Sequence, residues 1–223
     1  MKNYDIIVIG FGKAGKTLAV KAANLGKKVA VIEKSAQMYG GTCINIGCIP
    51  TKKLVNLSKE AQYVNNNVAG EYFTLSIEKK DALVSALRAK NFAMLDGNAN
   101  IDVINGAAKF IDKNSVEVAA ADGAKSVLTA PTIVINTGSV NEKTSFEVSS
   151  NLAYDSTGIL NLKTLPKHLA VVGGGYIGLE FASMFAEFGS KVTIIARSGV
   201  LKNEDEDVKQ SVKTLLQTQG IEI

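Results

Sequence analysis

The sequence predicts an α/β protein built from two units of the same plan, the second of them truncated. Two observations support this prediction. An apolar strand, a glycine-rich turn and a helix occur in that order twice, at residues 6–26 and again at residues 169–189. Each copy is followed by a second apolar strand, at residues 29–32 and at residues 192–195. Such continuous apolar runs are typical of parallel strands that helices cover on both faces.

Composition and charge place the chain among ordinary globular proteins. Its 223 residues, 46% of them hydrophobic and 21% charged, suffice for one large or two small domains. The net charge of +4 arises with lysines scattered along the chain, so neither nucleic acid nor an anionic membrane is an expected partner. No apolar run approaches the roughly 20 residues of a membrane span, and the N-terminus lacks a signal-peptide cleavage site. We therefore expect a cytoplasmic location.

The first glycine-rich turn has the spacing of a dinucleotide-binding loop. It reads Gly10-Phe11-Gly12-Lys13-Ala14-Gly15 between an apolar strand and a helix rich in small residues. Gly10 permits the tight turn, Gly12 lets a pyrophosphate approach the backbone, and Gly15 allows close helix packing. The free N–H groups at the helix start can then bind the diphosphate. Glu33, at the end of the next strand, is placed to accept hydrogen bonds from an adenosine ribose. The unit is therefore expected to be Rossmann-like, but its motif does not distinguish FAD from NAD.

Both cysteines of the chain lie in one segment, residues 40–53, which follows the second strand of the first unit. Two inert, buried cysteines are one interpretation of this pair. A structural disulfide is not favoured in a reducing cytosol, and a bridge from Cys43 to Cys48 would close a short loop that stabilises little. Helix-forming residues follow Pro50, so the pair is expected near a helix start, where the thiolate is favoured. The nucleotide loops on either side of the segment favour a redox-active dithiol/disulfide.

A family resemblance rests on the run Gly40-Gly41-Thr42-Cys43-Ile44-Asn45-Ile46-Gly47-Cys48-Ile49-Pro50-Thr51-Lys52. It resembles the signature of class I pyridine nucleotide–disulfide oxidoreductases, which include lipoamide dehydrogenase, glutathione reductase and mercuric reductase. The resemblance implies that hydride passes from NAD(P)H through FAD to the disulfide and then to a small oxidised substrate. It assigns Cys48 as the flavin-proximal thiolate and Cys43 as the interchange thiol that meets the substrate. Lys52 is implied to orient the flavin in a pair with Glu180. A simpler interpretation of Glu180 is a carboxylate in the first turn of a helix.

The resemblance continues through the rest of the first unit. A helix is expected over residues 77–95, a meander of strands over residues 102–118, and a buried strand with a small-residue turn over residues 132–139. Asn136 stands where the family usually has alanine. The FAD-binding residues that the motifs and the resemblance together indicate are Gly10, Gly12, Ala14, Gly15, Glu33, Lys34, Gly41, Thr42, Cys43, Gly47, Cys48, Lys52, Ala107, Ala108, Thr137, Gly138 and Ser139.

The second glycine-rich turn repeats the plan of the first and is expected to bind the pyridine nucleotide. A carboxylate at the end of the following strand would favour NADH, but Arg197 stands there with Lys202 shortly after. Because arginine can form a bidentate contact with a 2′-phosphate, we expect NADPH rather than NADH. An arginine on an exposed loop is the simpler alternative. The candidate residues of this unit are Gly173, Gly175, Tyr176, Ile177, Gly178, Arg197 and Lys202.

Other features of the second unit are interpreted as structural. Residues 203–207 are acidic, and they are expected to form the cap and first turn of a helix rather than a binding patch. His168, the only histidine, is expected at the surface. Residues 220–223 read as the beginning of another strand. No metal site is predicted.

The resemblance covers the whole chain but only the N-terminal half of a typical family member. The expected domains are an FAD-binding domain over residues 1–148 and an NAD(P)-binding domain over residues 149–223, joined through a linker at residues 140–153. The dimer interface and the acid/base His–Glu pair of the family are implied to lie outside this sequence, so a homodimer is expected only of the full-length enzyme.

Two hypotheses about function follow. In the first, the chain is part of a flavin-dependent disulfide reductase. In the second, it is a catalytically incomplete fragment that binds nucleotide without turnover. A lipoamide-dehydrogenase-type activity is a further alternative. Within the family, the residues 10–17, 38–41 and 154–158 most resemble mercuric-reductase-like flavoproteins linked to reactive chlorine or hypothiocyanite stress. The substrate cannot be identified from these residues.

Overall fold

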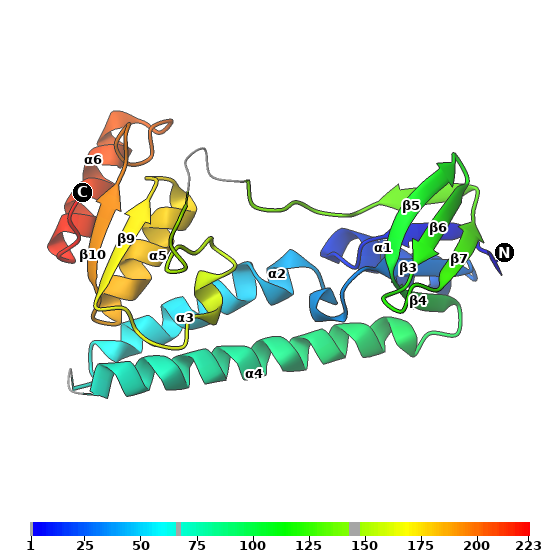
Figure 1. The fold of residues 1–223 in the computed structure, drawn as a ribbon, viewed down its shortest axis with the longest axis horizontal. Helices are drawn as coiled ribbons and strands as arrows, with labels where there is room; N and C mark the ends of the chain where they lie inside the picture. Colours follow the sequence, from blue (N-terminus) through cyan, green and yellow to red (C-terminus); the bar gives the residue numbers. More distant parts are fainter. Residues whose placement is uncertain (1, 66–67, 143–147) are drawn as a thin grey trace. The chain divides into compact units, whose positions relative to one another are not determined.

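The computed structural model describes residues 2–65, 68–142 and 148–223. They form the α/β fold that the sequence predicts, divided into two compact units (Figure 1). One unit comprises Met1–Pro50 with Ala82–Ser150, and the other comprises Thr51–Asp81 with Asn151–Ile223. The change of unit after Ser150 is close to the expected domain boundary, although residues 143–147 of the expected linker lie outside the described residues. The grouping of residues 51–81 with the second unit was not predicted.

The first unit is built on a parallel sheet of four strands in the order β4-β3-β2-β8. These strands are β2 (Ile6–Ile9), β3 (Val29–Glu33), β4 (Ile101–Asn105) and β8 (Thr132–Ile135). On one side, Ala19 and Ala22 of helix α1 (Lys13–Asn24) share a core with Val8 and Val31 of the sheet. Small side chains on α1 let the helix approach the strands closely, as a Rossmann-like unit requires.

A second sheet lies on the other side of the parallel sheet. Its order is β1-β7-β6-β5, from β1 (Lys2–Asn3), β5 (Ala107–Asp112), β6 (Ser115–Ala119) and β7 (Lys125–Thr129). Val116 and Leu128 of this sheet share a core with Ile7 and Ile32 of the parallel sheet. The expected meander is therefore present, but its start was predicted wrongly. Residues 101–105 form β4 and pair in parallel with β3, a partner about 70 positions earlier that no local pattern reveals.

The chain between β3 and β4 is helical over most of its length. A short 3₁₀ turn, η1 (Ala36–Met38), is followed by α2 (Thr42–Asn45), α3 (Cys48–Ala61) and α4 (Ala69–Asp96). Helix α4 begins at Ala69 rather than at residue 77. Its additional first turns contain the fully buried Phe73, whose ring lies 5.1 Å from that of Phe188. Burial of this aromatic pair stabilises the helix before residue 77, where the sequence did not predict it.

The second unit repeats the strand–turn–helix–strand plan. It contains β9 (His168–Val172), α5 (Tyr176–Glu187), β10 (Lys191–Ile195) and α6 (Glu206–Thr218). Strands β9 and β10 pair in parallel, and a single parallel bridge joins Thr193 to Glu222 where a further strand was expected to begin. Phe185 of α5 packs with Phe73 of α4, so this core uses residues from the 51–81 segment.

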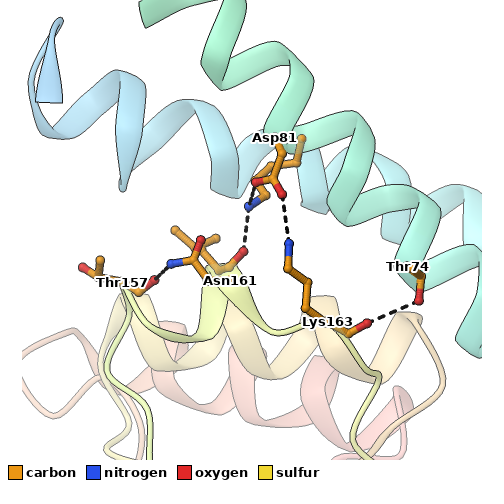
Figure 2. Close-up of polar contacts among 7 residues, drawn as sticks. Thr74, Asp81, Thr157, Asn161 and Lys163 are labelled. Carbon is orange, nitrogen blue, oxygen red and sulfur yellow. Dashed lines mark hydrogen bonds and ion pairs between the residues drawn. The ribbon is translucent and has the colours of Figure 1, made fainter. Parts of the chain in front are cut away.

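Polar contacts tie residues 157–163 to α4 inside the second unit (Figure 2). Asp81 of α4 faces Lys163, with 3.3 Å between Oδ2 and Nζ, and Thr74 donates to the carbonyl oxygen of Lys163 at 3.3 Å. Lys80, only 3% exposed, donates from Nζ to the carbonyl oxygen of Leu160 at 2.7 Å and also pairs with Asp81. Burial raises the pKa of the Asp81 carboxyl, but the hydrogen bonds and charges of Lys80 and Lys163 outweigh burial and hold this pKa below its ordinary value.

Within the described residues, no helix combines the length and the apolar character that crossing a membrane requires.

Candidate nucleotide-binding and redox sites

The first glycine-rich loop lies against the end of β8. Gly10 has φ of +104°, and a Cβ atom at this position would lie 2.2 Å from the carbonyl oxygen of Asn136. The side-chain amide of Asn136 donates to the carbonyl oxygen of Gly10 at 3.0 Å. Cβ atoms placed on Gly12 and Gly15 would lie 3.0 and 2.5 Å from the Asn136 amide nitrogen. Position 10 must therefore be glycine, and a side chain at position 12 or 15 would have to displace the Asn136 amide. Asn136, noted only as a departure from the family pattern, holds the loop in place.

Glu33 ends β3 beside the same loop, as the motif predicts. Glu33 is 8% exposed, and its carboxylate accepts hydrogen bonds from the backbone N–H of Phe11 at 3.0 Å and from that of Ser35 at 3.2 Å. These two bonds fix the carboxylate at the carboxyl end of the parallel strands, where α/β sheets bind their ligands. Contact with a ribose stays a prediction. Lys34, the next residue, is exposed.

The segment with the two cysteines packs directly on the nucleotide loop. Gly41 has φ of +77°, and a Cβ atom there would lie 2.6 Å from the Cα atom of Gly12. The side-chain amide of Asn45 donates to the carbonyl oxygens of Tyr39 at 3.0 Å and Gly41 at 2.9 Å. Arg88 of α4 donates in turn from Nε to Asn45 Oδ1 at 2.8 Å. The signature glycine and asparagine thus brace the turn immediately before Cys43, which sequence reasoning did not assign to them.

The cysteines occupy the short helix α2 and the start of α3. Cys43 is the second residue of α2 and is half-buried, whereas Cys48 is the first residue of α3 and is exposed. Both are free thiols in the structure. The expected position near a helix start is therefore confirmed. A hydrogen bond to Cys48, burial and the charge of Cys48 raise the pKa of the Cys43 thiol, while the charges of Lys13 and Lys16 act in the opposite direction.

The remaining candidate residues of the first unit lie around these two segments. A Cβ atom on Gly138, just after β8, would lie 4.0 Å from Thr42 Oγ1, and one on Gly47 would lie 3.1 Å from the carbonyl oxygen of Thr42. The backbone N–H of Gly106 donates to the carbonyl oxygen of Glu33 at 3.0 Å, which brings Ala107 and Ala108 close to the end of β3. Ala14 is exposed in the first turn of α1, and Thr137 and Ser139 flank Gly138. The glycine cradle and the convergence of these segments fit a bound dinucleotide.

Lys52 and Glu180 form an ion pair within the second unit. Lys52 Nζ donates to Glu180 Oε1, and their side chains are 68% and 33% exposed. Glu180 is the fifth residue of α5, and the first turn of this helix contains no acidic residue. The simpler interpretation of Glu180 as a first-turn carboxylate is therefore wrong. The pairing that the resemblance implied is present, and its role beside a flavin stays a prediction.

A cavity of about 490 Å³ opens at the second glycine-rich turn. It lies between that turn and the loop after β10, and both Arg197 and Lys202 line it. Tyr176 donates its hydroxyl to Glu204 across this site, and this hydrogen bond raises the pKa of the Tyr176 hydroxyl. Its lining residues are Gly173, Gly174, Gly175, Tyr176, Ala196, Arg197, Ser198, Gly199, Leu201, Lys202, Asn203 and Glu204.

Two further sequence-based assignments concern residues at or beside this cavity. Ile177 and Gly178 do not line it, and a Cβ atom on Gly178 would lie 2.7 Å from the carbonyl oxygen of Gly173. Gly178 therefore serves close packing of the turn on α5. The acidic run does form the start of a helix, as the sequence predicts: Asp205 is the N-cap of α6, and Glu206 and Asp207 lie in its first turn, although the Asp205 side chain makes no capping hydrogen bond. Glu204, in the same run, lines the cavity.

His168 is exposed, as predicted, and its Nε2 lies 2.9 Å from Thr193 Oγ1. In the part of the chain that the structure describes, no group of three or more histidine, cysteine or acidic side chains is placed to hold a metal ion.

Comparisons with known proteins agree with this geometry. The family model described as pyridine nucleotide-disulphide oxidoreductase matches residues 4–223. Curated relatives include a probable pyridine nucleotide-disulfide oxidoreductase, RclA, of Escherichia coli K12, which is 49% identical over 100% of this chain and 49% of its own length. A mercuric reductase of Lysinibacillus sphaericus is 40% identical over 99% of this chain and 41% of its own length. A dihydrolipoyl dehydrogenase of Geobacillus stearothermophilus is 35% identical over 98% and 48%.

Solved structures give the same result. The HOCl-induced flavoprotein disulfide reductase RclA from Escherichia coli superposes with a TM-score of 0.88 at 49% identity, over 99% of this chain and 48% of that one. Its Cu(II) complex gives a TM-score of 0.92 at 47% identity, over 100% of this chain and 49% of that one. The chain thus spans about half the length of the curated relatives it matches.

Proposed function

The chain belongs to the pyridine nucleotide-disulphide oxidoreductase family, and we propose that it supplies the FAD- and NADPH-binding parts of a disulfide reductase. In the proposed reaction, NADPH and one proton reduce the Cys43–Cys48 disulfide to two thiols and leave NADP⁺. The two thiols then pass the electron pair on to a small oxidised substrate, and their disulfide re-forms. FAD, when bound, relays the two electrons from the pyridine nucleotide to the disulfide.

The contact between Gly12 and Gly41 is the observation that supports this proposal most directly. It places the turn before Cys43 on the loop whose N–H groups are suited to a diphosphate. A dinucleotide bound there would lie beside the cysteine segment. The same contact explains why position 41 is glycine, since a side chain there would separate the two segments. We assign FAD to the domain of residues 1–148 and the pyridine nucleotide to the domain of residues 149–223 on this basis and on the cavity at Arg197.

Anaerobic titration of the purified chain with NADPH tests the proposal. We expect the flavin absorbance to bleach and a long-wavelength thiolate–flavin band to develop. Cys48→Ser should abolish this band, whereas Cys43→Ser should leave it visible, because only Cys48 is assigned to the flavin side. A colourless preparation without spectral response would support the alternative, a nucleotide-binding fragment without turnover.

NADPH is proposed as the reductant because two cations, Arg197 and Lys202, line the second cavity. Arginine can form a bidentate contact with the 2′-phosphate that distinguishes NADPH from NADH. Arg197→Glu should lower the ratio of NADPH to NADH efficiency, and Lys202→Glu should lower it less. An unchanged ratio in steady-state kinetics for both variants would contradict the assignment.

A dihydrolipoamide substrate is a second candidate, favoured by the 35% identity to a dihydrolipoyl dehydrogenase. Assays with dihydrolipoamide and NAD⁺ would show this activity directly. We also propose a cytoplasmic, homodimeric full-length enzyme. Cell fractionation and light scattering of the full-length protein test these two points.

A further inference from the structure

Lys16 is held in a defined position beside the cysteine segment. It lies in the second turn of α1, where its backbone N–H donates to the carbonyl oxygen of Gly12 at 3.0 Å. Its Nζ donates to Oδ1 of Asn91 on α4. Asn91 is 6% exposed, and its Nδ2 donates to the carbonyl oxygen of Leu87 at 2.7 Å. Because Nδ2 is engaged on its own helix, Oδ1 is the atom that faces the Lys16 ammonium.

This arrangement leaves the charge of Lys16 uncompensated. Its partner is a neutral amide, and no ion pair joins Lys16 to a carboxylate within the residues that the structure describes. Lys52 and Lys80, in contrast, are paired with Glu180 and Asp81. An ammonium oriented by an amide keeps its full electrostatic effect on neighbouring groups, whereas a carboxylate partner would cancel most of it.

Two contacts bring this cation to the redox segment. The close approach of Gly12 and Gly41 sets the first turns of α1 against the turn that precedes Cys43. A Cβ atom on Gly40 would lie 3.3 Å from Cγ of Asn91, so the residue that orients Lys16 also touches this turn. The hydrogen bond to Cys48, burial and the charge of Cys48 raise the pKa of Cys43 overall, and the charges of Lys13 and Lys16 oppose this rise. Burial and the charge of Lys13 lower the pKa of Lys16, whereas the charge of Cys43 acts in the opposite direction.

We propose that Lys16, oriented by Asn91, is a positioning residue that stabilises the thiolate form of Cys43. The step it favours is a deprotonation, in which the S–H bond of Cys43 breaks, the electron pair stays on sulfur and the proton passes to solvent. The thiolate is the form that attacks an oxidised substrate. This inference rests on the proposed function for the role of Cys43. It adds a residue outside the signature run to the chemistry of that thiol.

The test measures the reactivity of Cys43 without reference to turnover. Cys48→Ser leaves Cys43 as the only thiol of the chain, which contains two cysteines. In this background, the rate of alkylation by iodoacetamide is followed by mass spectrometry over a pH range centred on the ordinary thiol pKa of about 8.5. Variants Lys16→Met, Lys16→Arg and Asn91→Asp are compared with Lys21→Met, which removes the same charge from the last turn of α1.

Lys16→Met should shift the alkylation profile to higher pH and lower the rate near neutral pH about threefold, the size of effect expected for one partly exposed charge. Asn91→Asp should act in the same direction because it pairs the ammonium with a carboxylate, and it does so without removing Lys16. Lys16→Arg should keep the parent profile, since it restores the charge. Lys21→Met should leave the profile unchanged.

Equal profiles for the Lys16→Met and Lys21→Met variants would overturn the proposal. So would a loss of bound FAD in Lys16→Met with an unchanged profile, because the ammonium would then serve the cofactor phosphates. If circular dichroism shows that Lys16→Met does not fold, Asn91→Asp takes its place. An alkylation profile of Asn91→Asp equal to that of Lys21→Met would then overturn the proposal. Failure of the reductase proposal is distinguishable, since it would show in the NADPH titration and leave the alkylation profiles as predicted.

Discussion

Replacement of Lys80 by methionine tests how much one buried cation stabilises the second unit. Lys80 is 3% exposed and donates to the Leu160 carbonyl at 2.7 Å, and it also pairs with Asp81. Methionine retains most of the apolar stem, so the variant removes mainly the ammonium and its bonds. The matched control is Lys163→Met. Lys163 contacts the same carboxylate at 3.3 Å, but its side chain is 72% exposed (Figure 2).

The expected magnitudes follow from this difference in burial. Loss of the charged hydrogen bond from Lys80 leaves the carbonyl group of Leu160 without this donor and should cost about 2 kcal/mol of unfolding free energy. Loss of Lys163 removes a solvent-exposed ion pair, which contributes about 0.5 kcal/mol or less. The two variants therefore should differ by about 1.5 kcal/mol although they act on one acidic partner.

Urea unfolding followed by circular dichroism measures both variants against the parent chain. With a slope of about 2 kcal/mol per molar urea, Lys80→Met should lower the midpoint by about 1 M and Lys163→Met by about 0.25 M. Equal shifts for the two lysines would refute the reasoning, because burial would then not decide the strength of these contacts. A stabilised Lys80→Met variant would refute it as well, since apolar packing would then outweigh the lost hydrogen bond.

Three further predictions concern acid stability and the nucleotide loop. Because its folded pKa is depressed, Asp81 stabilises the second unit above its unfolded pKa of about 3.9, and this contribution is lost as the pH falls through the folded value. Asp81→Asn should therefore be less stable than the parent near neutral pH and equal to it in strong acid; a deficit that persists in acid contradicts this. Gly41→Ala, with φ of +77° and a backbone clash with Gly12, should cost at least about 1–2 kcal/mol and release FAD, whereas unchanged flavin content would argue against the contact. Glu33→Gln replaces one acceptor oxygen with a donor and should lower the urea stability of the first unit by about 1 kcal/mol; an unchanged midpoint would count against the two N–H contacts.

Local sequence patterns predicted the features that depend on neighbouring residues. The two glycine-rich turns, the strands that precede and follow them, and the helix start at Cys48 are all present as expected. Each depends on backbone conformation and on apolar runs a few residues long, and both are visible in a single stretch of chain. In contrast, the ion pair of Lys52 with Glu180, which are 128 positions apart in the sequence, was predicted only from the resemblance to the family.

The sequence by itself determined two units with nucleotide-binding motifs and a cysteine pair within the first of them. Only the tertiary structure decided where residues 51–81 pack, that Asn136 holds the first loop, that Glu204 lines the second cavity, and that Asn91 orients Lys16. In each of these cases the interacting residues are far apart in the sequence, or the residue is of a polar type that usually has a different role. Packing and hydrogen bonding between distant segments select one arrangement among many that the same local pattern allows.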